Sequence, residues 1–431
     1  MTTPSRPFRI LTIVLSCVGS LLAAELTTIH EWKYIEYAAE DPLVEHMLQV
    51  SEEYNYTKII PIDFQKISGN RVLVTTPRYS NDLLIPSLSI VSPMIGDGGS
   101  LLEPYPNWDW HETECCGDEI ITSVSRLFTD QCNRLWFVDS GKIGDKQVCS
   151  AKLFAFNTTT DQVIHRIDIP HELTHNSVDP SKGRLEIQFV ETKGDSCDET
   201  WAYIGDPEGY GLVIWDGSDI WRLENDDVYA PASSATKFSV AGENVTLELG
   251  TSIVRIPPPG FIDEDYLLLR PLSSYSDYAI RVEDLHNSKN SSVTYYKGNI
   301  TLPSQELVKV FSKSGVLMGA LASSLVVACW NLANPLATEY VGTPLEDDEA
   351  LQFTSAAKIF EGSEPGFEHE EYWMLTNRYQ KFALGTMDFD DVNFRILSVN
   401  IADTVQGTVC APSSHSATSI EDKFFFEYET V

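Results

Sequence analysis

The segment whose spacing most resembles a catalytic motif is His171-Glu172-Leu173-Thr174-His175, which has the HExxH pattern of zinc proteases. That chemistry needs an α-helix, because two imidazoles four positions apart then share one face while the glutamate reaches the metal-bound water. Pro170 and Pro180 enclose the motif and leave room for barely two helical turns, and no third ligand is identified. We therefore predict a loop after an outer strand, with no metal and no other cofactor.

The remaining motifs do not support catalysis either. The acidic clusters 346–349 and 388–391 lack the glycine that the spacing of an EF-hand loop requires. The glycine-rich segment 205–211 lacks the lysine of a phosphate-binding loop and reads as a turn between two strands. No G-x-S-x-G nucleophile elbow is present. We predict no catalytic residues.

The cysteines indicate an oxidising compartment. Cys17 lies in the apolar N-terminal stretch, and the others are Cys115, Cys116, Cys132, Cys149, Cys197, Cys329 and Cys410. Most of these seven should pair, and one is left over. The absence of C-x-x-C spacing argues against zinc, and the neighbouring Cys115 and Cys116 cannot easily serve separate bridges. The spare cysteine leaves open either a free thiol or a bridge between two copies of the chain.

The N-terminus predicts export. Residues 1–24 join Arg6 and Arg9 to an apolar run that is too short to span a membrane comfortably, as in a cleaved signal peptide. No later stretch is long and apolar enough for a membrane helix. N-x-S/T sequons predict glycosylation at Asn55, Asn157, Asn244, Asn290 and Asn299. We therefore expect a secreted, extracellular glycoprotein.

Short apolar runs bounded by turn residues read as buried strands, and they recur at intervals of roughly 50 to 66 residues. The first run of each repeat is Val72–Thr75, Arg134–Gly141, Trp201–Ile204, Tyr266–Leu269, Val316–Gly319 or Tyr372–Leu375. The second is Leu88–Val91, Leu153–Phe156, Leu212–Trp215, Tyr278–Val282, Val326–Trp330 or Phe394–Leu397. Repeats of this kind predict an all-β, six-bladed β-propeller, and the shorter rungs of a β-solenoid fit the spacing poorly.

The domain boundaries follow from this architecture. Residues 25–412 should form one propeller, with a flexible tail over 413–431 where Ser and Thr are frequent. An N-terminal strand at His30–Tyr37 is predicted to complete the last blade and close the ring. Residues 97–110, rich in Gly and Pro, should form a long connection between the first two blades.

The charge of the chain limits its partners. With 30 basic and 63 acidic residues, the net charge is −33. Such a chain repels phosphate backbones and anionic lipid headgroups, so we expect no nucleic acid and no membrane as partner. Solubility is the simpler reason for the acidity, and recruitment of a cationic ligand is the alternative.

Three motifs occurring in order carry a family resemblance: GDGGSLLEPYPNW at residues 96–108, CNRLWFVDSG at 132–141 and DDVNFRI at 390–396. Together they resemble the insect major royal jelly protein and Yellow family, and the royal jelly branch more closely, over about residues 32–410. The resemblance implies a secreted six-bladed propeller. It also implies the disulfides Cys132–Cys197 and Cys329–Cys410, and a bridge from Cys149 to Cys115 or Cys116.

The resemblance also implies a function: a non-catalytic protein that is nutritive or binds a small ligand in the central propeller cavity. Salivary Yellow relatives hold biogenic amines there, and the matching residues are Ser355, Asn377 and Tyr379. Asn377 and Ser355 would hydrogen-bond a ligand and Tyr379 would stack on it, although Asn377 at a strand exit also suits a turn. Arg378 disfavours a cationic amine. The alternative is a Yellow-type enzyme of melanin formation that converts dopachrome.

Overall fold

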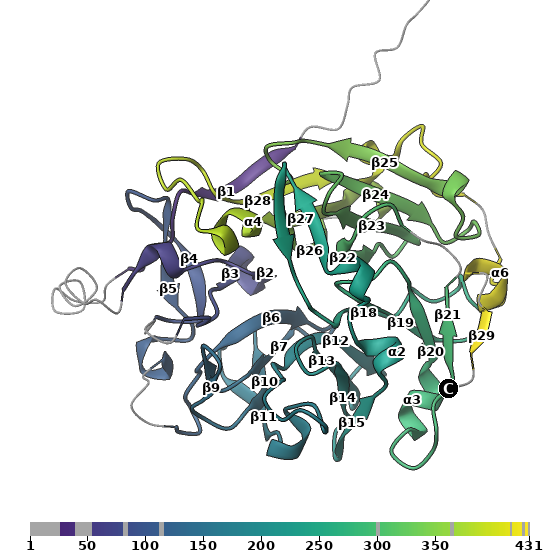
Figure 1. Ribbon diagram of the computed structural model, residues 1–431, viewed down its shortest axis with the longest axis horizontal. Helices are drawn as coiled ribbons and strands as arrows, with labels where there is room; N and C mark the ends of the chain where they lie inside the picture. Colours follow the sequence, from purple (N-terminus) through teal and green to yellow (C-terminus); the bar gives the residue numbers. More distant parts are fainter. Residues whose placement is uncertain are drawn as a thin grey trace, which may run out of the picture.

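The computed structural model describes residues 26–38, 54–80, 85–111, 116–298, 302–362, 366–413, 416–424 and 427–429. Six antiparallel sheets, five of four strands and one of five, stand around a common axis. Figure 1 shows the ring with one strand of each sheet near the centre and the last strand of each toward the periphery. The predicted six-bladed β-propeller is therefore confirmed.

Blades 1 to 6 are given from the axis outward. Blade 1 has β2 (Asp63–Ile67), β3 (Arg71–Thr75), β4 (Leu88–Ile95) and β5 (Ser100–Pro104). Blade 2 has β6 (Val124–Thr129), β7 (Arg134–Asp139), β10 (Lys152–Asn157) and β11 (Val163–Asp168). Blade 3 has β12 (Glu186–Lys193), β13 (Glu199–Asp206), β14 (Gly211–Trp215) and β15 (Ile220–Glu224).

Blade 4 has β18 (Thr251–Arg255), β19 (Tyr266–Pro271), β20 (Tyr278–Arg281), β21 (Tyr295–Lys297) and β29 (Glu427–Glu429). Blade 5 has β22 (Glu306–Phe311), β23 (Val316–Leu321), β24 (Val326–Asn331) and β25 (Val341–Glu346). Blade 6 has β26 (Thr354–Glu361), β27 (Glu370–Thr376), β28 (Phe394–Asn400) and β1 (Thr27–Trp32). Each predicted pair of runs falls on the second and third strands of one blade.

The middle strands are apolar along their length because each blade packs on both faces. In β7, Leu135, Trp136, Phe137 and Val138 are all buried, whereas the outermost strand β11 of the same blade is largely exposed. Side chains of two neighbouring blades meet between the sheets, as where Phe64 of blade 1 stacks on Trp373 of blade 6. A continuous apolar run therefore marks a strand covered by sheets on both sides.

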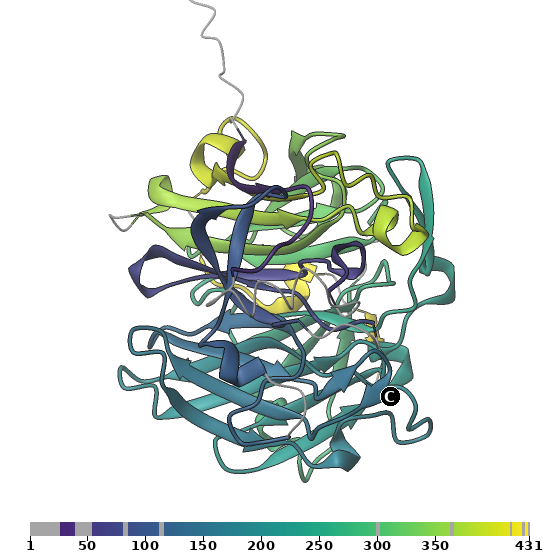
Figure 2. The ribbon, with the colours of Figure 1, turned by 90° about the vertical axis from the view of Figure 1, so that its left-hand side faces the viewer.

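The ring is closed by the N-terminal strand. β1 pairs antiparallel with β28, so the first strand of the chain is the outermost strand of the last blade. Figure 1 shows purple β1 beside yellow-green β28, and Figure 2 shows the first blade next to the last. The role is as predicted, but the strand ends at Trp32; the next residues turn, and Tyr37 bridges Leu102 of blade 1.

The remaining elements are short. Two hairpins lie outside the blades, β8 (Lys142–Ile143) with β9 (Lys146–Gln147) and β16 (Lys237–Val240) with β17 (Glu243–Thr246). The α-helices are α2 (Asp226–Tyr229), α3 (Val282–Asn287), α4 (Tyr379–Leu384), α5 (Ile401–Val405) and α6 (Ile420–Phe424). The 3-10 turns are η1 (Tyr56–Lys58), η2 (Ser68–Asn70), η3 (Trp108–His111), η4 (His171–Leu173), η5 (Ser233–Ala235), η6 (Thr338–Tyr340) and η7 (Phe367–His369).

One sequence prediction is wrong in this part of the chain. Residues 97–110 do not form only a connection, because Ser100–Pro104 is the strand β5 at the edge of blade 1. The glycines before it form the hairpin turn, where Gly99 has a φ of +142° that favours glycine. β5 is the outermost strand of its sheet, and Pro104 is its last residue, a position where the missing N–H is tolerated.

The structure describes part of the C-terminal segment but not the predicted signal peptide. The predicted signal peptide, residues 1–24, lies outside the described residues. Within 413–431, the segment predicted as a flexible tail, α6 and β29 lie against blade 4, where β29 pairs with β21 and Ile420 is buried. Among the described residues, no helix has both the length and the apolar character needed to cross a membrane.

Candidate functional site in the axial cavity

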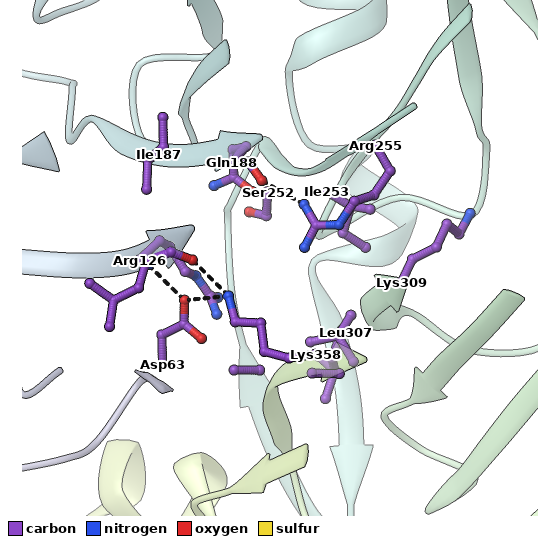
Figure 3. A pocket seen from close by; sticks show the side chains of 14 residues that line it. Asp63, Arg126, Ile187, Gln188, Ser252, Ile253, Arg255, Leu307, Lys309 and Lys358 are labelled. Atoms are coloured by element: carbon purple, nitrogen blue, oxygen red, sulfur yellow. Dashed lines mark hydrogen bonds and ion pairs between the residues drawn. The ribbon is translucent and has the colours of Figure 1, made fainter. Parts of the chain in front are cut away.

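The propeller axis encloses a cavity lined by all six inner strands. These strands are neighbours around the ring, β2 next to β6, β12, β18, β22 and β26 in turn. The lining has four basic side chains, Arg126, Arg255, Lys309 and Lys358, and one acidic side chain, Asp63. The rest of the lining is Leu127, Ile187, Gln188, Ser252, Ile253, Leu307, Val308, Ala356 and Ala357. The cavity is narrow, about 30 Å³, and its chemistry is predominantly cationic (Figure 3).

Lys358 and Asp63 form an ion pair across blades 6 and 1. The lysine Nζ lies 3.1 Å from Asp63 Oδ2 and donates a 2.7 Å hydrogen bond to the Leu127 carbonyl. Asp63 Oδ2 also accepts the Leu127 amide at 2.8 Å. Burial lowers the pKa of Lys358 to about 8 although Asp63 opposes the shift, and Arg255 and Arg126 lower the pKa further. A fraction of this lysine is therefore neutral near physiological pH.

Arg126 of β6 reaches across the axis. Its Nη1 donates to the Ser355 carbonyl, and its Nε lies 3.5 Å from Glu186 Oε2, too far for a well-formed hydrogen bond. Its Nε has no hydrogen-bond partner among the described residues. Burial raises the pKa of Glu186, so this carboxylate is a weakened counter-charge. Arg126 is thus only partly compensated.

Arg255 is the least compensated cation of the cavity. Its Nη1 donates to the carbonyls of Gln188 at 2.6 Å and Val254 at 2.7 Å. No carboxylate lies within ion-pairing distance of it among the described residues. Burial lowers the pKa of Arg255 to about 10, with Asp63 opposing the shift and Arg126 adding to it. In Figure 3 its guanidinium enters from the side opposite Arg126.

Lys309 is fully engaged away from the axis. Its Nζ lies 2.7 Å from Asp277 and 2.9 Å from Glu306, and Figure 3 shows the amine turned from the centre. Arg270 completes this buried network by pairing with Asp277. Burial alone would raise the pKa of Asp277, but Arg270 and Lys309 outweigh it and lower the pKa. Lys309 therefore contributes structure rather than a free charge.

A wider, aromatic chamber of about 220 Å³ adjoins the narrow cavity, and we call it the vestibule. Arg255 and Lys358 line both spaces, so the two cations stand at the boundary. The vestibule is otherwise lined by Gln65, Phe128, Thr129, Phe189, Ile256, Val310, Phe311, Ile359 and Phe360. Most of these side chains are partly exposed, so solvent reaches the chamber. The site can accommodate a small apolar body next to a charged head.

The three predicted ligand residues lie on blade 6. Ser355 is buried, and its hydroxyl approaches the Leu375 carbonyl at 3.4 Å. Asn377 is fully buried, donates to the Pro61 carbonyl at 2.8 Å and accepts from the Tyr379 amide at 3.2 Å, which is a structural role. Tyr379 packs on Phe353 with ring centroids 4.9 Å apart. None of the three lines the cavity or vestibule, and ligand binding by them stays a prediction.

The HExxH segment follows β11, as predicted. Only His171–Leu173 is helical, and it is a 3-10 turn rather than the α-helix that a zincin requires. The His171 and His175 rings lie edge to face with centroids 5.0 Å apart. The local conformation of residues 171–175 therefore differs from the helical one of a zinc protease motif.

Three disulfides are present in the described part of the chain: Cys132–Cys197, Cys329–Cys410 and Cys116–Cys149. The first two are those implied by the family resemblance, and the third decides between the two alternatives in favour of Cys116. Cys115 lies outside the described residues. Cys132–Cys197 joins blades 2 and 3, and Cys329–Cys410 ties blade 5 to the segment after blade 6. Cys116 and Cys149 both lie in segments that lead into strands of blade 2, so the other two bridges are the ones that connect parts of different blades.

Four of the predicted glycosylation sites are described. Asn244 and Asn290 are exposed, Asn55 and Asn157 are partly exposed, and Asn299 lies outside the described residues. Asn55 Oδ1 accepts hydrogen bonds from the amide and hydroxyl of Thr57, its own sequon threonine. Glycan attachment stays a prediction.

Sequence reasoning missed the cations of the cavity. Arg126, Arg255 and Lys358 are single basic residues within short strands, and nothing in their spacing connects them. The available signal was their position on the strand that precedes each buried apolar run, because the innermost strand of a blade comes first in the repeat. A charged residue in such a strand is a candidate for the axis.

The fold and the cavity define a class: a ring-closed six-bladed propeller with disulfides between blades and a cation-lined axial chamber. The sequence profile described as "Major royal jelly protein" matches residues 122–410. Major royal jelly protein 1 of Apis mellifera is 33% identical over 93% of both chains. Major royal jelly protein 6 of the same species is 32% identical over 91% of this chain and 90% of its own. This chain belongs to the major royal jelly protein family.

Among solved structures, virginiamycin B lyase from Staphylococcus aureus aligns over 88% of this chain and all of its own, with 10% identity and a TM-score of 0.39. A similarity at that level carries no functional argument.

Proposed function

We propose that this protein is a secreted, non-catalytic glycoprotein of royal jelly type that carries a small molecule in its axial cavity. The observation that carries this proposal is the vestibule of about 220 Å³ beside Arg255, whose Nε and Nη2 make no hydrogen bond within the described residues. A chamber that joins apolar walls to a few polar groups suits a small ligand. A purely nutritive role, which the name of the relatives suggests, would require no such chamber.

Export is supported by three independent features. Residues 1–24 resemble a signal peptide, the four described sequon asparagines are exposed or partly exposed, and the three disulfides need an oxidising compartment. The test is expression of the full chain in insect cells. Protein in the medium with a new N-terminus near residue 25 supports export, and full-length chain retained in the cells contradicts it.

The carrier function is tested by calorimetric titration of the purified protein with serotonin, dopamine and aromatic ligands of other charges. Binding of any of them, with competition among ligands for one site, supports a carrier. No heat from any ligand at millimolar concentration contradicts it. A dopachrome-conversion assay runs beside the titration, and a protein-dependent rate would favour the Yellow-type enzyme instead.

A second copy of this chain is the proposed protein partner. Since Cys116 is bridged to Cys149, Cys115 is the one cysteine of the mature chain that the three disulfides do not use. A bridge between the Cys115 residues of two copies would link them. The carrier proposal does not depend on this bridge.

A further inference from the structure

We propose that the axial cavity binds a small organic monoanion: its carboxylate lies at Arg255 and Lys358, and its aromatic body occupies the vestibule. This inference rests on the proposed carrier function and adds the charge and shape of the ligand. It differs from the amine carriage implied by family resemblance, because the side chains at this site carry the wrong charge for an amine.

The first observation is a reversal of charge between the whole chain and the cavity. Acidic residues outnumber basic ones by 63 to 30 in the sequence, yet the cavity lining has four basic side chains and one acidic one. Glu186, which lies behind Arg126, adds a second carboxylate, but burial raises its pKa. A chain with few cations thus concentrates several of them on its axis.

The second observation is that the charges do not balance. Lys309 has two carboxylate partners and Lys358 has Asp63, whereas Arg255 has only backbone carbonyls among the described residues. Arg255 is only partly exposed. A guanidinium in such a place without a counter-ion is less well satisfied than one in open water, and a carboxylate satisfies it with paired hydrogen bonds. The Nε and Nη2 of Arg255 are available for that geometry. The cavity therefore lacks one negative charge, which a ligand can supply.

The third observation concerns the body of the ligand. Phe128 and Phe189 meet edge to face at 5.0 Å, and Phe311 and Phe360 face the same chamber. A 150 Å³ apolar cavity holds benzene, so about 220 Å³ suits a single aromatic ring or a compact bicyclic one. Because Arg255 and Lys358 stand where this chamber narrows, a short arm must separate the ring from the carboxylate.

A cationic ligand with the same body would meet the opposite conditions. Its ammonium group would lie beside Arg255, Lys358 and Arg126, and only Asp63 and Glu186 could oppose the repulsion. Asp63 is already paired with Lys358 and the Leu127 amide. The cavity should therefore distinguish ligands by charge as well as by shape.

The experiment compares three ligands that share an indole ring: indole-3-acetate, its neutral amide and tryptamine. Calorimetry on the full mature chain should show indole-3-acetate binding at least about tenfold more tightly than tryptamine, since hydrogen bonds to charged groups contribute more than neutral ones. Arg255→Gln should weaken indole-3-acetate by about tenfold or more and leave the amide nearly unchanged. Arg166→Gln, on the outermost strand of blade 2, is the matched control and should change neither affinity.

The outcomes separate the two proposals. Equal or tighter binding of tryptamine by the unmodified protein overturns the anion inference and leaves the carrier function standing. Anion binding that Arg255→Gln does not weaken, in a variant whose thermal unfolding matches that of the unmodified chain, overturns the assignment to this cavity. If none of these ligands, serotonin or dopamine gives heat, both proposals fail. If Arg255→Gln does not fold, the comparison of the three ligands on the unmodified protein decides alone.

Discussion

The state of Lys358 makes a sharp prediction about pH and stability. Its pKa is lowered from 10.5 to about 8 in the folded protein, mainly by burial. Between those two values, the unfolded chain binds more protons at this side chain than the folded chain does. Stability contributed by this group therefore rises as pH increases from about 8 to about 10. The charged groups that act on Lys358 are Asp63, which opposes the shift, and Arg255 and Arg126, which add to it.

The size of the effect follows from the shift. A difference of about 2.5 pKa units corresponds to about 3 kcal/mol at most, and the side chain is only 13% exposed, so solvent screening removes little of it. Lys358→Met keeps a similar volume but cannot titrate. The variant loses the pairing with Asp63 at neutral pH and is expected to be less stable there. Its disadvantage should then grow by about 2 to 3 kcal/mol at about pH 10.

Urea unfolding of both proteins at several pH values between about 7 and 10 measures this difference. Buried tyrosines such as Tyr37 and Tyr372 have raised pKa values, so they reduce the stability of the folded state at the alkaline end. The tyrosines act equally in the unmodified chain and in Lys358→Met, so their effect cancels when the two unfolding free energies are subtracted. A stability difference that stays constant with pH would show that Lys358 titrates as an ordinary lysine, and the account of a crowded cationic cavity would be wrong.

Other predictions concern the bridges and the blade turns. Replacing Cys329 and Cys410 together by Ser should lower the free energy of unfolding by about 4 to 5 kcal/mol, because their bridge spans 81 residues; a urea midpoint unchanged from the parent would refute this. Cys115→Ser should remove any disulfide-linked dimer from a non-reducing gel, and a persisting dimer would exclude this cysteine. Asp130→Asn should cost about 3 kcal/mol, since the buried carboxylate accepts four hydrogen bonds, two of them from Arg134; thermal unfolding within a degree of the parent would contradict that role.

The fold could be predicted because its strongest sequence signal comes from burial. The second and third strands of each blade lie between two neighbouring sheets, so runs such as Leu135–Val138 remain apolar on both faces. An edge strand is covered on fewer sides and need not be apolar throughout. The sequence of Ser100–Pro104 therefore gives no clear strand signal and predicts a connection instead. The N-terminal strand was displaced by a few residues for the same reason: its outer face is exposed, and β1 shows one bulge between Thr28 and His30.

The candidate site could not be predicted because no local pattern encodes it. Arg126 and Arg255 are 129 positions apart in the sequence, and Arg255 and Lys358 are 103 apart. They meet only because the ring brings the inner strands together. Asn377 shows what a resemblance leaves open: it suggested a ligand contact, whereas in the structure the side-chain amide donates to the Pro61 carbonyl. A family resemblance indicates which positions correspond, but the hydrogen bonds that each residue makes in this structure indicate what it does here.

The opposite charges of the exterior and the cavity are compatible because they act over different distances. At physiological ionic strength, the screening length is about 8 Å, so the −33 of the whole chain is felt mainly outside the protein, where it favours solubility. Arg255 and Lys358 line the cavity and act on a group inside it at contact distance, well within that screening length. Net charge therefore gives no guidance about the charge of a ligand in this cavity, and recruitment of a cationic ligand by the acidic exterior stays a prediction. For the proposed ligand, the few side chains that face the axis are the better guide to charge.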